Sequence, residues 1–149
     1  MTILDYYKII KNSVQFKEAD LVAIRCYKND VKNMEGRASV NLRFERETNL
    51  LSEDIAEVKL ITYLSLENDF FNFEIEYKGT CYKLDETISE EEFERYAHDQ
   101  VVPLLLPYVR ECISSLMSKM NIPVFTIPTI DVLDTLEANS VERVNSYNE

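Results

Sequence analysis

Few residues of this chain belong to types that do chemistry together, and their spacing fits no common catalytic arrangement. The single histidine, His98, stands beside Asp99 in a polar stretch without a nucleophile at helical spacing, so a surface helix position explains it better than a general base. Glu74 and Glu76 share one strand face, where solvent exposure explains them as well as paired catalytic carboxylates do. The sequence therefore argues against an enzyme and against any cofactor.

An acidic run that resembles a metal or acid/base cluster is better explained as the start of a helix. Ser89 followed by Glu92 has the spacing of a capping box. The carboxylates of Glu90, Glu91 and Glu94 complement the positive end of the helix dipole. With only 2 glycines, the chain also lacks a glycine-rich phosphate-binding loop.

Charge and cysteine content limit the partners and the compartment. A net charge of −11 disfavours binding to duplex nucleic acid or to anionic membranes. Cys26, Cys81 and Cys112 are an odd number without CxxC spacing, which indicates small buried residues in a reducing compartment. The N-terminus lacks signal-peptide character, and the longest apolar stretch, 101–109, is shorter than the roughly 20 residues that span a bilayer. We expect a soluble cytoplasmic protein without membrane insertion.

The first part of the chain predicts strands. Residues 9–27 form a long irregular strand candidate, and apolar and polar residues alternate clearly in 38–45 and 71–78. In 58–66 both strand faces are apolar. Strands over about 7–83 with short connections predict a four-stranded antiparallel sheet, within one domain that covers 1–149.

The second part predicts two helices packed on one face of that sheet, which makes the fold class α+β. The first helix covers about 89–120 and should kink or break near residues 102–106, which contain a proline and precede another. Asn121 can end this helix in a left-handed conformation. A second helix covers about 129–144, followed by a polar tail.

The segment 106–136 is the most informative part of the chain. Two amphipathic helical patterns flank an apolar crossover between prolines, in the order LPYVRECI (106–113), IP (122–123), TIP (126–128) and IDVL (130–133). This order and spacing resemble the second half of the SecB family of bacterial export chaperones. Met120-Asn121 stands where the family usually has a glycine, and the segment 13–17 lacks the acidic residues of typical members.

The resemblance implies a SecB-like fold and a holdase chaperone that binds unfolded polypeptide clients without hydrolysing nucleotide. It also implies a homotetramer built as a dimer of dimers, in which the helix after residue 106 packs between subunits. The apolar residues of that helix that we assign to the oligomer interface are Tyr108, Val109, Cys112 and Leu116. A small sheet covered on one face cannot hide all of the apolar residues, which agrees with such an interface.

Exposed apolar grooves between sheet and helix would hold the clients, which we expect to be preproteins for Sec-dependent export. The predicted client-binding residues, each of which core or oligomer packing explains equally well, are Phe16, Phe44, Tyr63, Phe125, Ile127, Ile130 and Leu133. Acidic residues on the outer sheet face would engage the SecA translocase motor, and the candidates are Glu57, Glu74 and Glu76. Two alternatives stay open: a chaperone dedicated to an antitoxin of a toxin–antitoxin system, and a module that binds a small apolar ligand.

Overall fold

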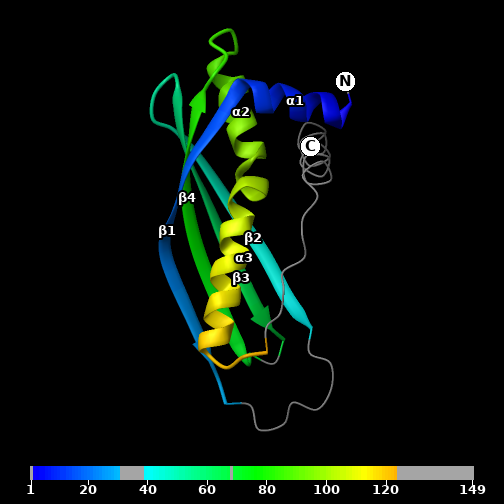
Figure 1. The fold of residues 1–149 in the computed structure, drawn as a ribbon, viewed down its shortest axis with the longest axis vertical. Helices are drawn as coiled ribbons and strands as arrows, with labels where there is room; N and C mark the ends of the chain where they lie inside the picture. The colour runs from blue at the N-terminus through cyan, green and yellow to red at the C-terminus, as the bar shows by residue number, and fades with distance from the viewer. Residues whose placement is uncertain (1, 31–38, 68, 124–149) are drawn as a thin grey trace, which may run out of the picture.

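A four-stranded antiparallel sheet with helices on one face forms the body of the molecule, and the predicted α+β fold class is confirmed (Figure 1). The structure, a computed structural model, describes residues 2–30, 39–67 and 69–123. The order of strands in the sheet is β1-β4-β3-β2. The strands are β1 (Val14–Lys28), β2 (Val40–Leu50), β3 (Ile55–Leu66) and β4 (Phe71–Lys83). The helices are α1 (Ile3–Ser13), α2 (Glu90–Asp99) and α3 (Val101–Lys119).

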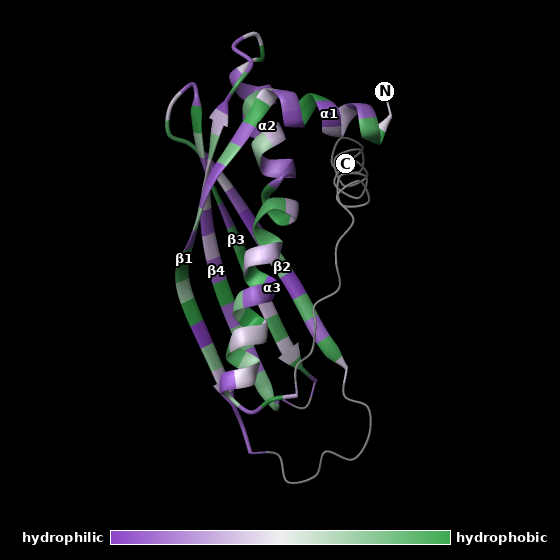
Figure 2. Ribbon diagram, viewed as in Figure 1, coloured by the Kyte–Doolittle hydropathy of each residue, from purple (hydrophilic) through white to green (hydrophobic). Residues whose placement is uncertain are grey.

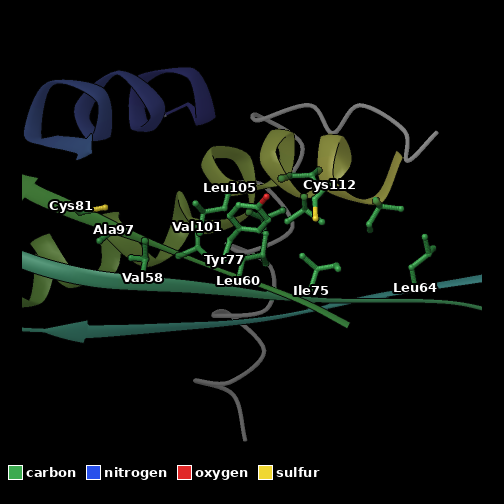
Figure 3. Close-up of a cluster of buried hydrophobic side chains, with 14 of the residues drawn as sticks. Val58, Leu60, Leu64, Ile75, Tyr77, Cys81, Ala97, Val101, Leu105 and Cys112 are labelled. Atoms are coloured by element: carbon green, nitrogen blue, oxygen red, sulfur yellow. The ribbon is translucent and has the colours of Figure 1, made fainter. Parts of the chain in front are cut away.

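In the central strands β3 and β4, every second side chain is buried against the helices, and the residues between them are mostly half-buried on the outer face. Figure 2 shows hydrophobic and hydrophilic residues alternating along strands of the sheet. In Figure 3, Leu60, Ile75 and Tyr77 of the sheet face Val101 and Leu105 of α3. The hydrophobic core therefore lies between these strands and the α2–α3 segment.

The edge strand β1 is long but irregular. Its pairing with β4 shifts register between Lys17 and Ala19 and again between Leu21 and Ala23. Glu18, inside the first shift, has φ 66°, a left-handed conformation that non-glycine residues rarely adopt. Such bulges bend a strand and disturb the row of backbone groups that another strand would pair with.

Helices α2 and α3 confirm the predicted start at Ser89, but the break occurs elsewhere than predicted. The chain breaks at Gln100, before the two prolines. Pro103 lies in the first turn of α3, where a backbone N–H has no partner within the helix. The missing N–H of Pro103 therefore costs the helix no hydrogen bond, and the helix continues through this residue. Pro107 is tolerated within the helix, and Asn121 follows α3 with φ 55°, as predicted.

The N-terminal segment corrects the sequence prediction, which placed strand from about residue 7. Residues 3–13 form α1, and β1 starts only at Val14. The helix is fixed by a capping box that the prediction overlooked: the Thr2 hydroxyl accepts a hydrogen bond from the Asp5 N–H at 3.1 Å, and the Asp5 carboxylate accepts one from the Thr2 N–H at 3.2 Å. Ile10 anchors the helix because its side chain is fully buried.

One helical segment of the described residues, Glu90–Lys119, is long and apolar enough to span a membrane by length and composition. Core helices of globular proteins pass the same test. In this structure the segment lies on the sheet, with Val109 and Ile113 fully buried against it. The helix predicted over about 129–144 lies outside the described residues.

Candidate functional site

Large apolar side chains are exposed along β1 and the neighbouring side of α3. Leu21, Val22 and Ile24 of β1 are 45%, 50% and 39% exposed, and Tyr108 of α3 is 46% exposed. We call these four residues the β1–α3 surface. Single exposed apolar residues are ordinary, but a group on adjacent elements marks a contact site.

The strand register and one ring contact bring the members of the β1–α3 surface together. Leu21 lies opposite Tyr77 of β4, and the ring centroid of Tyr77 lies 6.1 Å from that of Tyr108. Ile24 lies opposite Ile75, one of the core residues under α3. Burial raises the pKa of Tyr77 to about 12, so its hydroxyl stays neutral at physiological pH. The Tyr77 hydroxyl therefore adds no charge to this surface, and Glu111 of α3 is a charged residue near it.

A cavity of about 330 Å³ lies beneath α1, at the start of β1 and beside the break between α2 and α3. Phe16 forms part of its wall, together with Val14 and Leu104. The ring of Phe16 lies against the backbone at Gly79, where an added Cβ would collide with it. A glycine is therefore required at this position, because it lets the ring lie on the sheet beside the cavity.

The outer sheet face, opposite the helices, holds the acidic residues predicted to dock a motor protein. Glu74 pairs with Arg25 at 3.0 Å, and Glu57 lies 3.6 Å from the ammonium of Lys78. Glu76 lies between Ile61 and Ala23 in the neighbouring strands. Acidic and basic side chains thus alternate on this face, and those two carboxylates are compensated within the chain.

A buried polar network joins α1, the α2–α3 break and β2, and sequence reasoning missed it. The Tyr6 hydroxyl donates a hydrogen bond to the Asp99 carboxylate at 2.6 Å, and the guanidinium of Arg46 lies 4.0 Å from the same carboxylate. Arg46 also donates to the backbone carbonyl of His98, whose Nδ1 lies 2.8 Å from the Thr48 hydroxyl. Asp99 is almost fully buried. His98 is therefore a half-buried structural residue and not the surface residue that the sequence predicts.

The structure separates the predicted client-binding residues. Phe16 and Phe44 lie half-buried on the helix side of the sheet, on opposite edge strands. Tyr63 lies on the outer face, where its hydroxyl donates to Glu45 at 3.3 Å and Arg43 stacks on its ring. Tyr63 therefore cannot share a groove with the other two. The remaining predictions, Phe125, Ile127, Ile130 and Leu133, lie outside the described residues.

The predicted interface residues also divide. Tyr108 is exposed and Leu116 half-buried, so both offer surface to a neighbour. Val109 is fully buried and Cys112 nearly so, because both face the sheet. These two residues belong to the core rather than to an interface. Burial also raises the pKa of the Cys112 thiol and brings that of Cys81 to about 12, as expected for small buried residues.

Within the described ranges, histidine, cysteine and acidic side chains form no group of three or more that could hold a metal ion. The Asp99 carboxylate contacts Tyr6 and Arg46 inside the chain. Features of the described residues that are open to a partner include the β1–α3 surface, the cavity beneath α1, and a polar pocket of about 540 Å³ between β2 and α2 that Arg46, Glu94 and His98 help to line.

Comparisons with known proteins assign this fold. The sheet order and the helices on one face define an α+β fold. The family similarity reported below identifies the protein class as a chaperone. The chain belongs to the SecB family, whose model, described as preprotein translocase subunit SecB, matches residues 23–142. No curated protein sequence matches the chain.

Two solved structures are similar. One is the Mycobacterium tuberculosis Rv1957 SecB-like chaperone in complex with a ChAD peptide from the Rv1956 HigA1 antitoxin. It superposes with a TM-score of 0.70 at 18% identity and covers 87% of this chain and 98% of its own. The other, a protein of unknown function from Streptococcus agalactiae, reaches a TM-score of 0.45 at 10% identity over 77% of this chain and 96% of its own.

Proposed function

We propose that this chaperone is a holdase that binds unfolded polypeptides in the cytoplasm without hydrolysing nucleotide. Membership of the SecB family supports a chaperone. A holdase needs to stay in solution, and it needs apolar sites that cover the aggregation-prone apolar segments of a client. The net charge of −11 favours solubility. The cavity beneath α1 and the β1–α3 surface offer the apolar sites.

The observation that carries the client site is the cavity beneath α1. Its walls include Val14, Phe16 and Leu104, so it offers a client side chain an apolar environment. A volume of about 330 Å³ is at the small end of ligand pockets and suits one large side chain at a time. Each cavity alone would therefore bind a client weakly.

Several cavities act together if the protein is oligomeric. We assign the β1–α3 surface to the contact between subunits of a homotetramer, because Leu21, Ile24 and Tyr108 together form an exposed apolar surface. A long unfolded chain that reaches several cavities in one assembly gains affinity by multivalency, without any sequence specificity. Tight binding of an unfolded client then requires both the cavity beneath α1 and the subunit contact at the β1–α3 surface.

The client class follows less directly from the geometry. Preproteins for Sec-dependent export are the expectation from the family, but Glu57 and Glu74 are compensated by basic neighbours, which does not favour docking of a basic motor segment. The M. tuberculosis protein was solved with an antitoxin peptide, which makes a dedicated antitoxin the second candidate. Mixing the purified protein with the SecA motor separates these classes: a stable complex supports export, and no complex supports a dedicated client.

Suppression of client aggregation tests the holdase. The wild-type protein should keep a chemically unfolded polypeptide in solution, and Phe16→Ser should weaken this severalfold because it removes the aromatic wall of the cavity. Leu84→Ser removes an equally apolar but exposed side chain outside the cavity and serves as the matched control. If Phe16→Ser fails to fold, Leu104→Ser makes the same test from α3. Full suppression by both cavity variants would contradict the proposed client site.

A further inference from the structure

The cavity beneath α1 carries polar groups that a purely apolar client site does not require. The side chain of Gln100 lines it and is only 8% exposed. Gln100 precedes α3, yet its side chain makes no cap hydrogen bond, and its carboxamide has no hydrogen-bond partner among the described residues. This amide reaches the cavity instead of being sealed in the core, so its N–H groups can donate to a ligand group placed there.

A cation lies at the same cavity. Lys11, in the last turn of α1, lines it together with Tyr7. Asp99, which precedes Gln100 in the chain, turns its carboxylate to Tyr6 and Arg46. Lys11 forms no ion pair with a carboxylate of the described residues. An ammonium and an amide N–H at one small site are the donors that a carboxylate accepts from.

The size of the cavity selects among carboxylates. About 330 Å³ accommodates one residue and not a folded peptide. Apolar walls from Phe16, Pro103 and Leu104 require an apolar side chain, while Lys11 and Gln100 require an anionic acceptor. Only the last residue of a polypeptide carries a free carboxylate and a side chain on the same Cα.

We propose that the cavity beneath α1 binds the C-terminal residue of a client when that residue has a large apolar side chain. The α-carboxylate accepts hydrogen bonds from the Lys11 ammonium and the Gln100 carboxamide, and the side chain packs against Phe16 and Leu104. This inference rests on the proposed holdase function and adds a preferred point of attachment. A chain end held in this way leaves the rest of the client to bind other copies of the cavity.

Fluorescent peptides test this preference. Two peptides of one unfolded sequence end in phenylalanine, one as the free acid and one as the amide, and a third ends in serine as the free acid. The wild-type protein should bind the phenylalanine acid about tenfold more tightly than the phenylalanine amide, since a hydrogen bond to a charged group contributes that much. It should also bind the phenylalanine acid about tenfold more tightly than the serine acid, which has no large apolar side chain to bury. Lys11→Met and Gln100→Leu should each remove most of the difference between acid and amide. Lys8→Met removes an exposed cation of the same helix that does not line the cavity and should leave the difference intact.

Other outcomes overturn the inference. Equal binding of acid and amide, or an equal loss in Lys8→Met and Lys11→Met, would exclude a specific carboxylate site. Direct binding of 3-phenylpropionate without any binding of the peptides would assign the cavity to small carboxylic acids. If the intact protein still holds unfolded polypeptide while the peptides show no end preference, this inference fails and the holdase function stands.

Discussion

The two edge strands of the sheet contact the helices in different ways. At the β1 edge, Ile24 lies opposite Ile75 and Leu21 lies opposite Tyr77, on which Tyr108 packs. At the β2 edge, apolar packing by side chains such as Phe44 is joined by a polar contact, since Arg46 reaches the carboxylate of Asp99. The exposed side chains also differ, because β2 exposes only polar residues, whereas β1 exposes Leu21, Val22 and Ile24 as well as charged residues.

The difference has a physical consequence. Hydrogen bonds and ion pairs are directional, so the polar β2 edge and its pocket suit only a partner with matching polar groups. Apolar contact has no fixed partner, and the exposed area of Leu21 and Ile24 is free to be buried by another molecule. The bulges of β1 disturb its backbone edge, so its side chains rather than its backbone should make the contact. We therefore assign assembly to the β1 edge and internal stability to the β2 edge.

The largest effect should follow from charging the β1 edge. The double variant Leu21→Asp, Ile24→Asp places two carboxylates in the proposed interface, and burying unpaired charge costs several kcal/mol. Dissociation of the oligomer should become about a thousandfold easier, which light scattering across a concentration series measures. Leu51→Asp, at a side chain 61% exposed in the β2–β3 turn, is the matched control and should leave the mass unchanged. An unchanged mass in the double variant would refute the assignment.

The β2 edge is tested by Arg46→Met. This change removes the cation that lies 4.0 Å from the buried Asp99 carboxylate and should lower the free energy of unfolding by about 3 kcal/mol in urea denaturation. Arg43→Met breaks an exposed pair with Glu45 on the same strand and should cost less than about 1 kcal/mol. Equal losses in the two variants would show that the network is no stronger than a surface pair.

Alkaline pH should destabilise the β1 half of the sheet through Cys81, which lies opposite Phe16. The folded-state pKa of this thiol is about 12 against an ordinary 9.0, so the stabilisation is complete below pH 9 and is lost as the pH rises towards 12. At about pH 10 this amounts to about 1 kcal/mol, measured as the change in unfolding free energy from about pH 8. Cys81→Ala should show a correspondingly smaller change, and an identical pH dependence in the variant would exclude the thiol as its source.

The smallest effect concerns the helix beside the β2 edge. Ser89→Ala removes the hydroxyl that accepts from the Glu92 N–H at 3.1 Å and should cost about 1 kcal/mol of unfolding free energy. The same cap lowers the pKa of Glu92 through its hydrogen bonds to Ser89, so this contribution should fade as the pH falls below about 4.5. Urea denaturation measures this loss. Ser118→Ala, at an exposed position of α3, is the control and should leave the unfolding free energy unchanged.

Local pattern predicted much of this fold. The alternation in β4, the capping box at Ser89 and the left-handed Asn121 each depend on residues a few positions apart, and each is observed. The helix α1 differs from the sequence prediction because Ile9 and Ile10 favour strand by composition, whereas the competing helix signal is the capping box of Thr2 with Asp5.

The candidate site depended on longer-range relations. The hydrogen bond between Tyr6 and Asp99 joins residues 93 positions apart, so a local sequence pattern cannot predict it. The cavity beneath α1 requires α1, whose existence was not predicted, so only Phe16 of its lining was anticipated. The sequence prediction assigned both Tyr63 and Phe44 to client binding, although strand pairing places them on opposite faces of the sheet.

The central claim, that this chain holds unfolded polypeptide through apolar sites shared among subunits, is tested most directly by light-scattering chromatography. The purified protein is run alone, with a permanently unfolded polypeptide, and with the folded form of that polypeptide. We predict a tetramer that co-elutes with the unfolded polypeptide and forms no complex with its folded form. A small species that ignores both would contradict the claim.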